Sequence, residues 1–142
     1  ELKYDKSLID YPNSKNLEKK FNFISLSDNM ATIMAIANDI SYDDVFSLQI
    51  SKKITENDIL IAISGSGNSK NIIKAVEYAK SCGAKVVGLS GYNGGKLKEL
   101  ADYHMHVDIM DMQITEDIHM TFDHMFMKIL MNFFKNNEIS GN

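Results

Sequence analysis

The stretch that decides the fold is "DILIAISGSGNSKNIIKAVEYAKSCGAKVVGLS", residues 58–90. It begins with an apolar run, passes through a loop of serines and glycines, continues with helical spacing and ends on a second apolar run. Short apolar runs bounded by turn residues predict buried strands over 58–64 and 84–90. The segment between them, 69–83, is predicted to be a helix closed by Gly83. This order indicates a right-handed crossover between parallel strands.

The same alternation continues on both sides of this unit. We predict strands over 21–27 and 103–109, and helices over 28–39, 42–54, 94–101 and 112–134. The fold class is therefore α/β, a three-layer α/β/α sandwich with a mostly parallel sheet and a long C-terminal helix. Residues 21–135 are predicted to form one domain. The segment 1–20 has no readable pattern, and the tail 136–142 is expected to fray.

Composition limits the kind of protein. A chain of 142 residues, 44% apolar and 24% charged, fits one globular domain. The net charge is -4 and lysines alternate with acids, so we expect no nucleic acid partner. No run is long enough to span a membrane, and the first residues do not resemble a secretory signal, so a cytoplasmic protein is expected. The single cysteine, Cys82, excludes an internal disulfide.

The serine and glycine loop, residues 64–69, raises the question of a bound anion. A helix N-terminus has unpaired N–H groups and partial positive charge, so it stabilises an anion without a lysine. The loop lacks the third glycine of a dinucleotide fingerprint and the Gly-Lys-Ser/Thr of a P-loop. Three hydroxyls could donate to a terminal phosphate, those of Ser64, Ser66 and Ser69. The alternative is an ordinary turn in which Ser69 caps the next helix.

Residues 63–102, "ISGSGNSKNIIKAVEYAKSCGAKVVGLSGYNGGKLKELAD", closely resemble the signature half of the SIS (sugar isomerase) domain family. The similarity continues through "ISLSDNMATIMAIANDISYDDVFSLQI" and "MQITEDIHMTFDHMFMKIL", and it is greatest to the sedoheptulose-7-phosphate (phosphoheptose) isomerase branch. This resemblance implies a five-stranded parallel sandwich of flavodoxin-like arrangement that binds phosphorylated sugars. It implies a phosphate site formed by Ser64, Gly65, Ser66 and Ser69.

The resemblance also implies residues that contact the sugar. Asn38 and Asp39 match the Asn-Asp pair of that branch. In the long helix, the H-x4-H spacing with His119 places His124 on the family's catalytic histidine, and Glu116 stands where the branch has glutamine. Steps of four residues advance only ~40° each, so Glu116 and His124 share one broad face and His119 points elsewhere. Glu116 could act as the enediol-forming base, ligate a divalent metal such as zinc with His124, or repel an anionic ligand.

The family's N-terminal helix, first strand and Gly-Asn-Gly-Gly-Ser loop have no counterpart here. One interpretation is that the chain is a fragment, in which case Glu1 would match the family's catalytic glutamate. Methionines and phenylalanines of the long helix are typical of a core and a subunit interface, and we expect a homodimer or homotetramer. His104 and His106 alternate on one face of the last strand, where solvent exposure at a sheet edge is expected.

We predict an aldose–ketose isomerase for a sugar phosphate, without a required cofactor. The serine loop would anchor the phosphate, and Glu116 with His124 would relay a proton between adjacent carbons. The alternative is a noncatalytic phosphosugar sensor or adaptor, which the glutamate at position 116 and the missing N-terminal motif favour. A scaffold whose loop binds no ligand is a third hypothesis.

Overall fold

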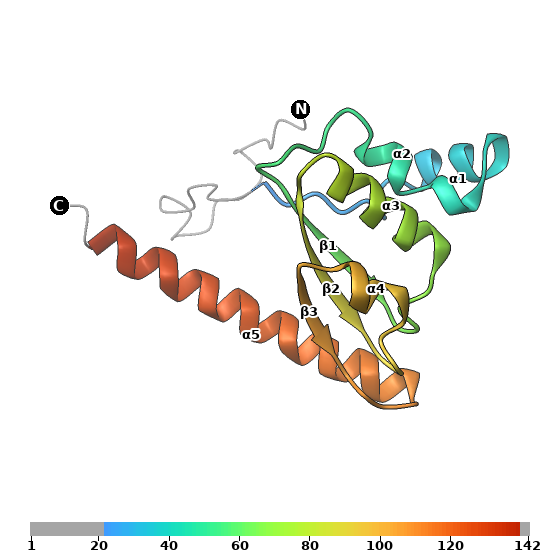
Figure 1. Cartoon of the computed structure of the whole chain (residues 1–142). Coiled ribbons are helices and arrows are strands. Elements are labelled where there is room, and N and C mark those ends of the chain that lie inside the picture. Colours follow the sequence, from blue (N-terminus) through green and yellow to red (C-terminus); the bar gives the residue numbers. More distant parts are fainter. Residues whose placement is uncertain (1–21, 140–142) are drawn as a thin grey trace.

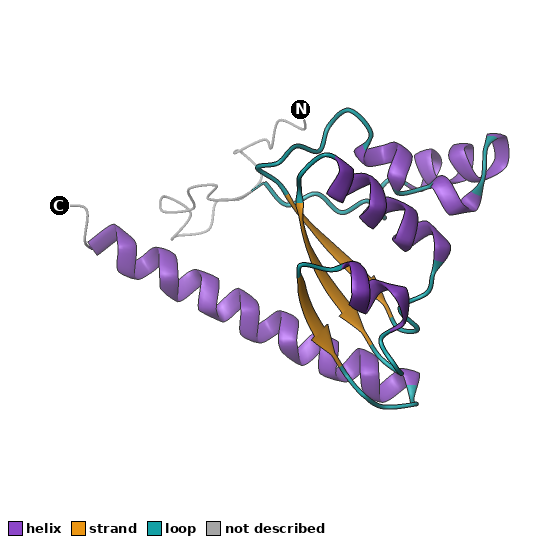
Figure 2. Cartoon of the chain, in the orientation of Figure 1, coloured by secondary structure: helices purple, strands orange, loops and turns teal. Residues whose placement is uncertain are grey.

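A three-stranded parallel sheet forms the centre of the computed structural model, which describes residues 22–139 (Figure 1). The strands lie in the order β1 (Ile59–Ser64), β2 (Lys85–Ser90) and β3 (Tyr103–His106). Helices α3 (Lys70–Ser81) and α4 (Gly95–Leu100) lie on one side, and α5 (Met112–Ile139) runs along the other (Figure 2). The predicted α/β sandwich with a parallel sheet and a long C-terminal helix is confirmed. The described residues contain three strands, where the resemblance implied five.

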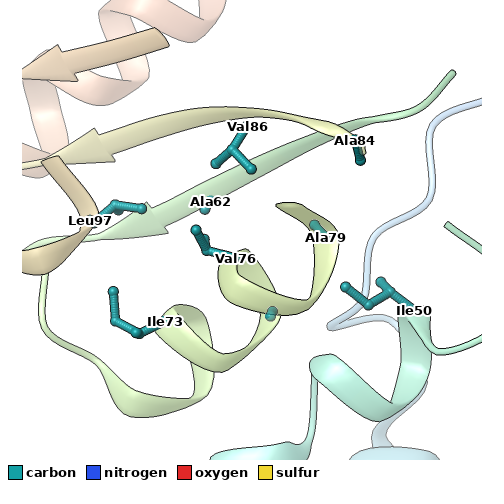
Figure 3. Close-up of a cluster of buried hydrophobic side chains, with 9 residues drawn as sticks. Ile50, Ala62, Ile73, Val76, Ala79, Ala84, Val86 and Leu97 are labelled. Carbon is teal, nitrogen blue, oxygen red and sulfur yellow. The ribbon is translucent and has the colours of Figure 1, made fainter. Parts of the chain in front are cut away.

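The main core lies between the sheet and α3 (Figure 3). Strand residues alternate between the two faces of a sheet. In β1, Ala62 and Ser64 are buried toward α3, whereas Ile59, Ile61 and Ile63 on the other face are exposed. The buried side chains that fill this core include Ile50, Ala62, Ile73, Val76, Ala79, Val86 and Leu97.

The end of α3 directs the chain into β2. Gly83 has a φ of 83°, a left-handed conformation that glycine adopts without a side-chain clash. Its N–H donates to the Lys80 carbonyl at 3.0 Å, and the Ala84 N–H donates to the Ala79 carbonyl at 3.1 Å. These two bonds form a Schellman motif, which stops the helix where the sequence predicted.

Two predicted elements are wrong. Residues 22–27, the described part of the first predicted strand, form no strand. A strand requires a backbone partner, and the Leu26 carbonyl instead accepts from the Gln49 side-chain amide at 3.0 Å. The predicted helix over 42–54 is divided into η3 (Tyr42–Asp44) and α2 (Ser47–Ile50). The chain leaves α2 at Ser51, and Lys52 adopts a φ of 61°, which is incompatible with a right-handed helix.

The remaining helices agree with the sequence. Helix α1 (Met30–Asp39) begins at Asn29, whose side chain accepts from the Thr32 N–H at 3.0 Å, and none of its residues is buried. Helix α5 extends to Ile139, five residues beyond its predicted end, whereas β3 ends at His106, three residues early. No helix in the described range 22–139 is both long enough and apolar enough to cross a membrane.

Candidate functional site

The serine loop, residues 64–69, lies at the carboxyl end of β1, the edge where ligands bind in parallel α/β sheets. Its backbone forms a tight turn, because the Gly67 N–H donates to the Ser64 carbonyl at 2.9 Å and Gly67 has a φ of 68°. The Gly91 N–H donates to the Gly65 carbonyl at 2.8 Å. The loop is therefore joined to the segment that follows β2.

The hydroxyls of the serine loop bond within the loop and not to the backbone of α3. Ser69 stands at the N-cap of α3, yet its side chain makes no capping bond. The Ser64 hydroxyl, which is buried, donates to the Ser69 Oγ at 3.0 Å. The Ser66 Oγ accepts from the Asn68 N–H at 3.2 Å. Ser69 therefore stands at the N-cap position without the side-chain bond of an ordinary serine cap. The exposed Ser66 and Ser69 each keep a hydroxyl proton that can be donated to a ligand.

Backbone amides at the start of α3 add further donors. The Ile72 N–H is taken by the Asn71 side chain at 2.9 Å. Within the described chain, the Lys70 and Asn71 N–H groups have no such acceptor, as is usual for a first helical turn. Two hydroxyls and two amides beside the positive end of a 12-residue helix form a suitable environment for one anionic group.

Helix α5 brings a second set of side chains to this edge. Met112 packs so closely against Gly65 that a side chain at position 65 would collide with its sulfur. One and three turns farther along, Glu116 and His124 are exposed, with the exposed Met120 between them. His119 is buried and points away from that face, as predicted, with its Nε2 3.3 Å from the Ser90 carbonyl oxygen. The side chains of Glu116 and His124 form no hydrogen bond with any residue that the structure describes.

The predicted sugar-contacting residues, Asn38 and Asp39, form no side-chain hydrogen bond with the described serine loop. Asn38 and Asp39 are exposed at the end of α1, and the Asn38 amide donates to the Asp39 carboxylate at 2.8 Å. Element η3 contacts both α1 and α3, and its Asp44 pairs with Lys74 at 2.8 Å. Glu1 lies outside the described residues.

His104 and His106 were expected to be solvent-exposed, and this expectation is wrong because both rings are half-buried and bonded. The His104 Nε2 lies 2.9 Å from the fully buried Ser90 hydroxyl. The His106 Nδ1 lies 2.9 Å from the Lys98 ammonium, and its Nε2 lies 2.9 Å from the Tyr92 carbonyl oxygen. An ammonium group can only donate a hydrogen bond, so the Nδ1 of His106 accepts from Lys98. The ring proton then lies on Nε2, which donates to the Tyr92 carbonyl.

A surface cleft of about 270 Å³ lies beside the serine loop and was not predicted from the sequence. Its lining includes three lysines, but Lys96 pairs with Glu77 at 2.5 Å and Lys74 pairs with Asp44. The third lysine, Lys70, lies in the first turn of α3 and adds a positive charge beside the hydroxyls and amides of the serine loop. The described residues include no group of three or more His, Cys, Asp or Glu side chains placed to hold a metal ion.

Comparisons with known proteins agree with this geometry. A family model described as "SIS domain" matches residues 20–91. The chain is 40% identical over 121 residues to the phosphoheptose isomerase of Helicobacter pylori (strain Shi470), covering 84% of this chain and 63% of that protein. It is 38% identical over 109 residues to the phosphoheptose isomerase of Aliarcobacter butzleri (strain RM4018), covering 77% and 58%.

Solved structures give the same result. A phosphoheptose isomerase from Francisella tularensis matches with a TM-score of 0.68 at 33% identity, covering 71% of this chain and 55% of that one. Another from Neisseria gonorrhoeae matches with a TM-score of 0.75 at 29% identity, covering 77% and 61%. The chain thus spans between 55% and 63% of the length of these four proteins. The named relatives are enzymes, which does not favour the sensor or adaptor alternative. Because the family model covers half of its residues, the chain belongs to the SIS domain family.

Proposed function

We propose that this protein is an aldose–ketose isomerase that acts on sedoheptulose 7-phosphate or a related sugar phosphate. The observation that carries the proposal is the orientation of Ser69, which bonds to Ser64 and leaves the start of α3 uncapped. An uncapped helix N-terminus with free hydroxyl protons suits a phosphate ester. The names of the similar proteins, all phosphoheptose isomerases, support the same substrate class.

In this proposal the serine loop binds the phosphate. Ser66 and Ser69 donate their hydroxyl protons to phosphate oxygens, and the first amides of α3 donate to the same group. Ser64 acts behind Ser69, because its buried hydroxyl fixes the position of the Ser69 oxygen. Gly65 keeps the loop free of a side chain where Met112 approaches. Asn38 and Asp39 orient sugar hydroxyls from the end of α1.

The reaction moves one proton between two adjacent carbons. A base removes a proton from C1 of the ketose, the bonding pair forms a C1–C2 double bond, and the carbonyl oxygen takes a proton to give an enediol. Delivery of a proton to C2 and loss of the O1 proton then produce the aldose. We assign this work to Glu116 and His124, a carboxylate and an imidazole, which are side-chain types that act as general bases and acids. They lie eight residues apart, about 12 Å along the helix, so both side chains must lean toward the same pair of carbons for this transfer.

A divalent metal is not needed for this proton transfer. Glu116 and His124 would supply two oxygen or nitrogen ligands to a zinc ion, which takes at least three from the protein. A metal at this position would therefore need a further ligand from outside the exposed face of α5. We also propose a homodimer or homotetramer, which is argued from the exposed surface of α5 below.

The test uses purified protein and sedoheptulose 7-phosphate, with formation of the aldose measured over time. We expect the double variant Ser66→Ala/Ser69→Ala to raise KM about a hundredfold, because each of the two lost charge-assisted bonds costs on the order of 1.5 kcal/mol. His124→Ala should lower kcat about a hundredfold. The matched control is Ser81→Ala, an exposed serine at the opposite end of α3. Turnover by the wild type that does not exceed that of His124→Ala would contradict the isomerase proposal.

A further inference from the structure

The segment after β2, here called the glycine turn (residues 91–95), packs directly against the serine loop. A side chain at Gly67 would collide with the Gly94 carbonyl group, so these two backbones touch. The Gly67 carbonyl also accepts from the Leu97 N–H, in the first turn of α4, at 2.9 Å. Leu97 is fully buried. The loop is thus held against a rigid part of the core through a second, non-covalent connection.

The Asn68 side chain also joins the serine loop to the start of α4. Its Nδ2 donates to the Ser66 carbonyl at 3.0 Å, and its Oδ1 accepts from the Lys96 N–H at 3.0 Å. A reversed amide would place two donors together at Lys96 and two acceptors together at Ser66, so the network fixes the orientation. Gly95 permits this contact, because a β-carbon there would lie 2.5 Å from the Asn68 Nδ2.

Asn68 also bonds to the hydroxyl of Ser66, through its backbone N–H. The Asn68 N–H donates to the Ser66 Oγ at 3.2 Å, which occupies a lone pair of that oxygen and leaves its proton for another acceptor. Asn68 therefore bonds to both the backbone and the side chain of Ser66. The amides of Lys96 and Leu97, which could otherwise bind a ligand, are used to fix the loop.

We propose that Asn68 is a positioning residue for phosphate binding, which ties the serine loop to the start of α4 and fixes Ser66 in the orientation that donates to the ligand. This inference rests on the proposed phosphate site in the serine loop. Preorganised donors bind more tightly because the cost of ordering them is not paid on binding. Loss of the Asn68 carboxamide should therefore weaken phosphate binding although Asn68 itself donates nothing to the ligand.

The test compares two asparagines of similar setting. Asn68→Ala removes the side-chain part of the connection. Asn93→Ala removes an amide that accepts from the Gly95 N–H at 3.2 Å and that forms no hydrogen bond with the serine loop among the described residues. Titration with inorganic phosphate and with sedoheptulose 7-phosphate, well below the melting temperature of every variant, should show about tenfold weaker binding for Asn68→Ala. Asn93→Ala should bind within about twofold of the wild type. Asn68→Ser, which keeps a shorter polar side chain, replaces Asn68→Ala if that variant does not fold.

The outcomes separate this inference from the proposed function. Wild-type affinity in Asn68→Ala, or an equal loss in Asn93→Ala, would overturn the role of Asn68 while the phosphate site stands. A wild type that binds neither inorganic phosphate nor the sugar phosphate would overturn the site itself, and the role of Asn68 with it. If turnover is measured, Asn68→Ala should raise KM and leave kcat nearly unchanged, because the phosphate is remote from the reacting carbons.

Discussion

His104 lies on β3 near three other basic side chains. Protonation of His104 therefore affects the stability of the folded chain. Burial lowers the pKa of His104 below its usual 6.5, and the nearby His106, Lys98 and His119 lower the pKa further. The unfolded chain therefore binds the His104 proton more readily than the folded one. The contribution of His104 to folding stability is fully present above pH 6.5. It is lost as the pH falls from that value toward the lower pKa that His104 has in the folded chain.

We accordingly predict that the melting temperature falls by a few degrees between pH 7.5 and pH 5, and that His104→Gln reduces this fall. Differential scanning calorimetry across the pH range measures both. His124→Gln is the matched control, because His124 is not among the groups that lower the pKa of His104 and its replacement leaves the contribution of His104 in place. If wild type and His104→Gln show the same pH dependence, the buried environment of His104 is not responsible.

Single residues of the serine loop illustrate what the sequence could predict. The spacing of Ser64, Ser66 and Ser69 after an apolar run was sufficient to locate the loop at a strand end and a helix start. The direction of each hydroxyl was not predictable, because it depends on bonds within the folded turn. The contact of Asn68 with Lys96 was also missed, since 28 residues separate them and β2 lies between.

At the scale of elements, α3 and the loops at its two ends depend on two glycines with positive φ, Gly67 and Gly83. Gly83→Ala should lower the free energy of unfolding by about 1 kcal/mol, because alanine is strained in the left-handed region. Gly67→Ala should cost more, since its new side chain would also meet the Gly94 carbonyl, a backbone group that cannot rotate away. Urea unfolding of both variants measures these changes.

Phosphate titration distinguishes the two glycines further. Gly83 lies at the far end of α3, so Gly83→Ala should keep wild-type affinity for inorganic phosphate. Gly67→Ala should lose most of that affinity, because the glycine turn can no longer hold the serine loop. Equal affinities in the two variants would mean that the packing of the glycine turn on the loop does not influence binding.

Elements with strong local signals were predictable. Helix α3 has apolar residues at helical spacing and a glycine stop, and β1 and β2 are short apolar runs. Residues 22–27 carry a similar apolar pattern but form no strand, because pairing depends on a neighbour that local sequence does not specify. The early end of α2 depends on the turn at Lys52, a residue type with no preference for positive φ.

At the scale of the whole molecule, much apolar surface is uncovered. Met120, Met127 and Met131 on α5 are 58%, 40% and 67% exposed. Together with His124 they follow the spacing 4-3-4, which aligns side chains in one stripe along a helix and is typical of helices that pack against each other. Isoleucines 59, 61 and 63 on the open face of β1 are exposed as well. Surfaces of this kind usually mark an interface, so we expect α5 to pack against a second copy of the chain.

The prediction is that the protein has a solution mass of two or four times 16.0 kDa. Light scattering coupled to size exclusion measures this mass. Met127→Glu/Met131→Glu should shift the mass toward that of one chain, because two carboxylates would have to be buried in the stripe. Asn132→Glu is the control, since it adds a carboxylate at an exposed position outside the stripe and should leave the mass unchanged. A wild type with the mass of one chain, or a double variant that keeps the wild-type mass, would show that the stripe is not the interface.

Because His124 lies within the stripe, a dimer formed there would also enclose the proposed catalytic imidazole. The double variant should then lose turnover along with its assembly.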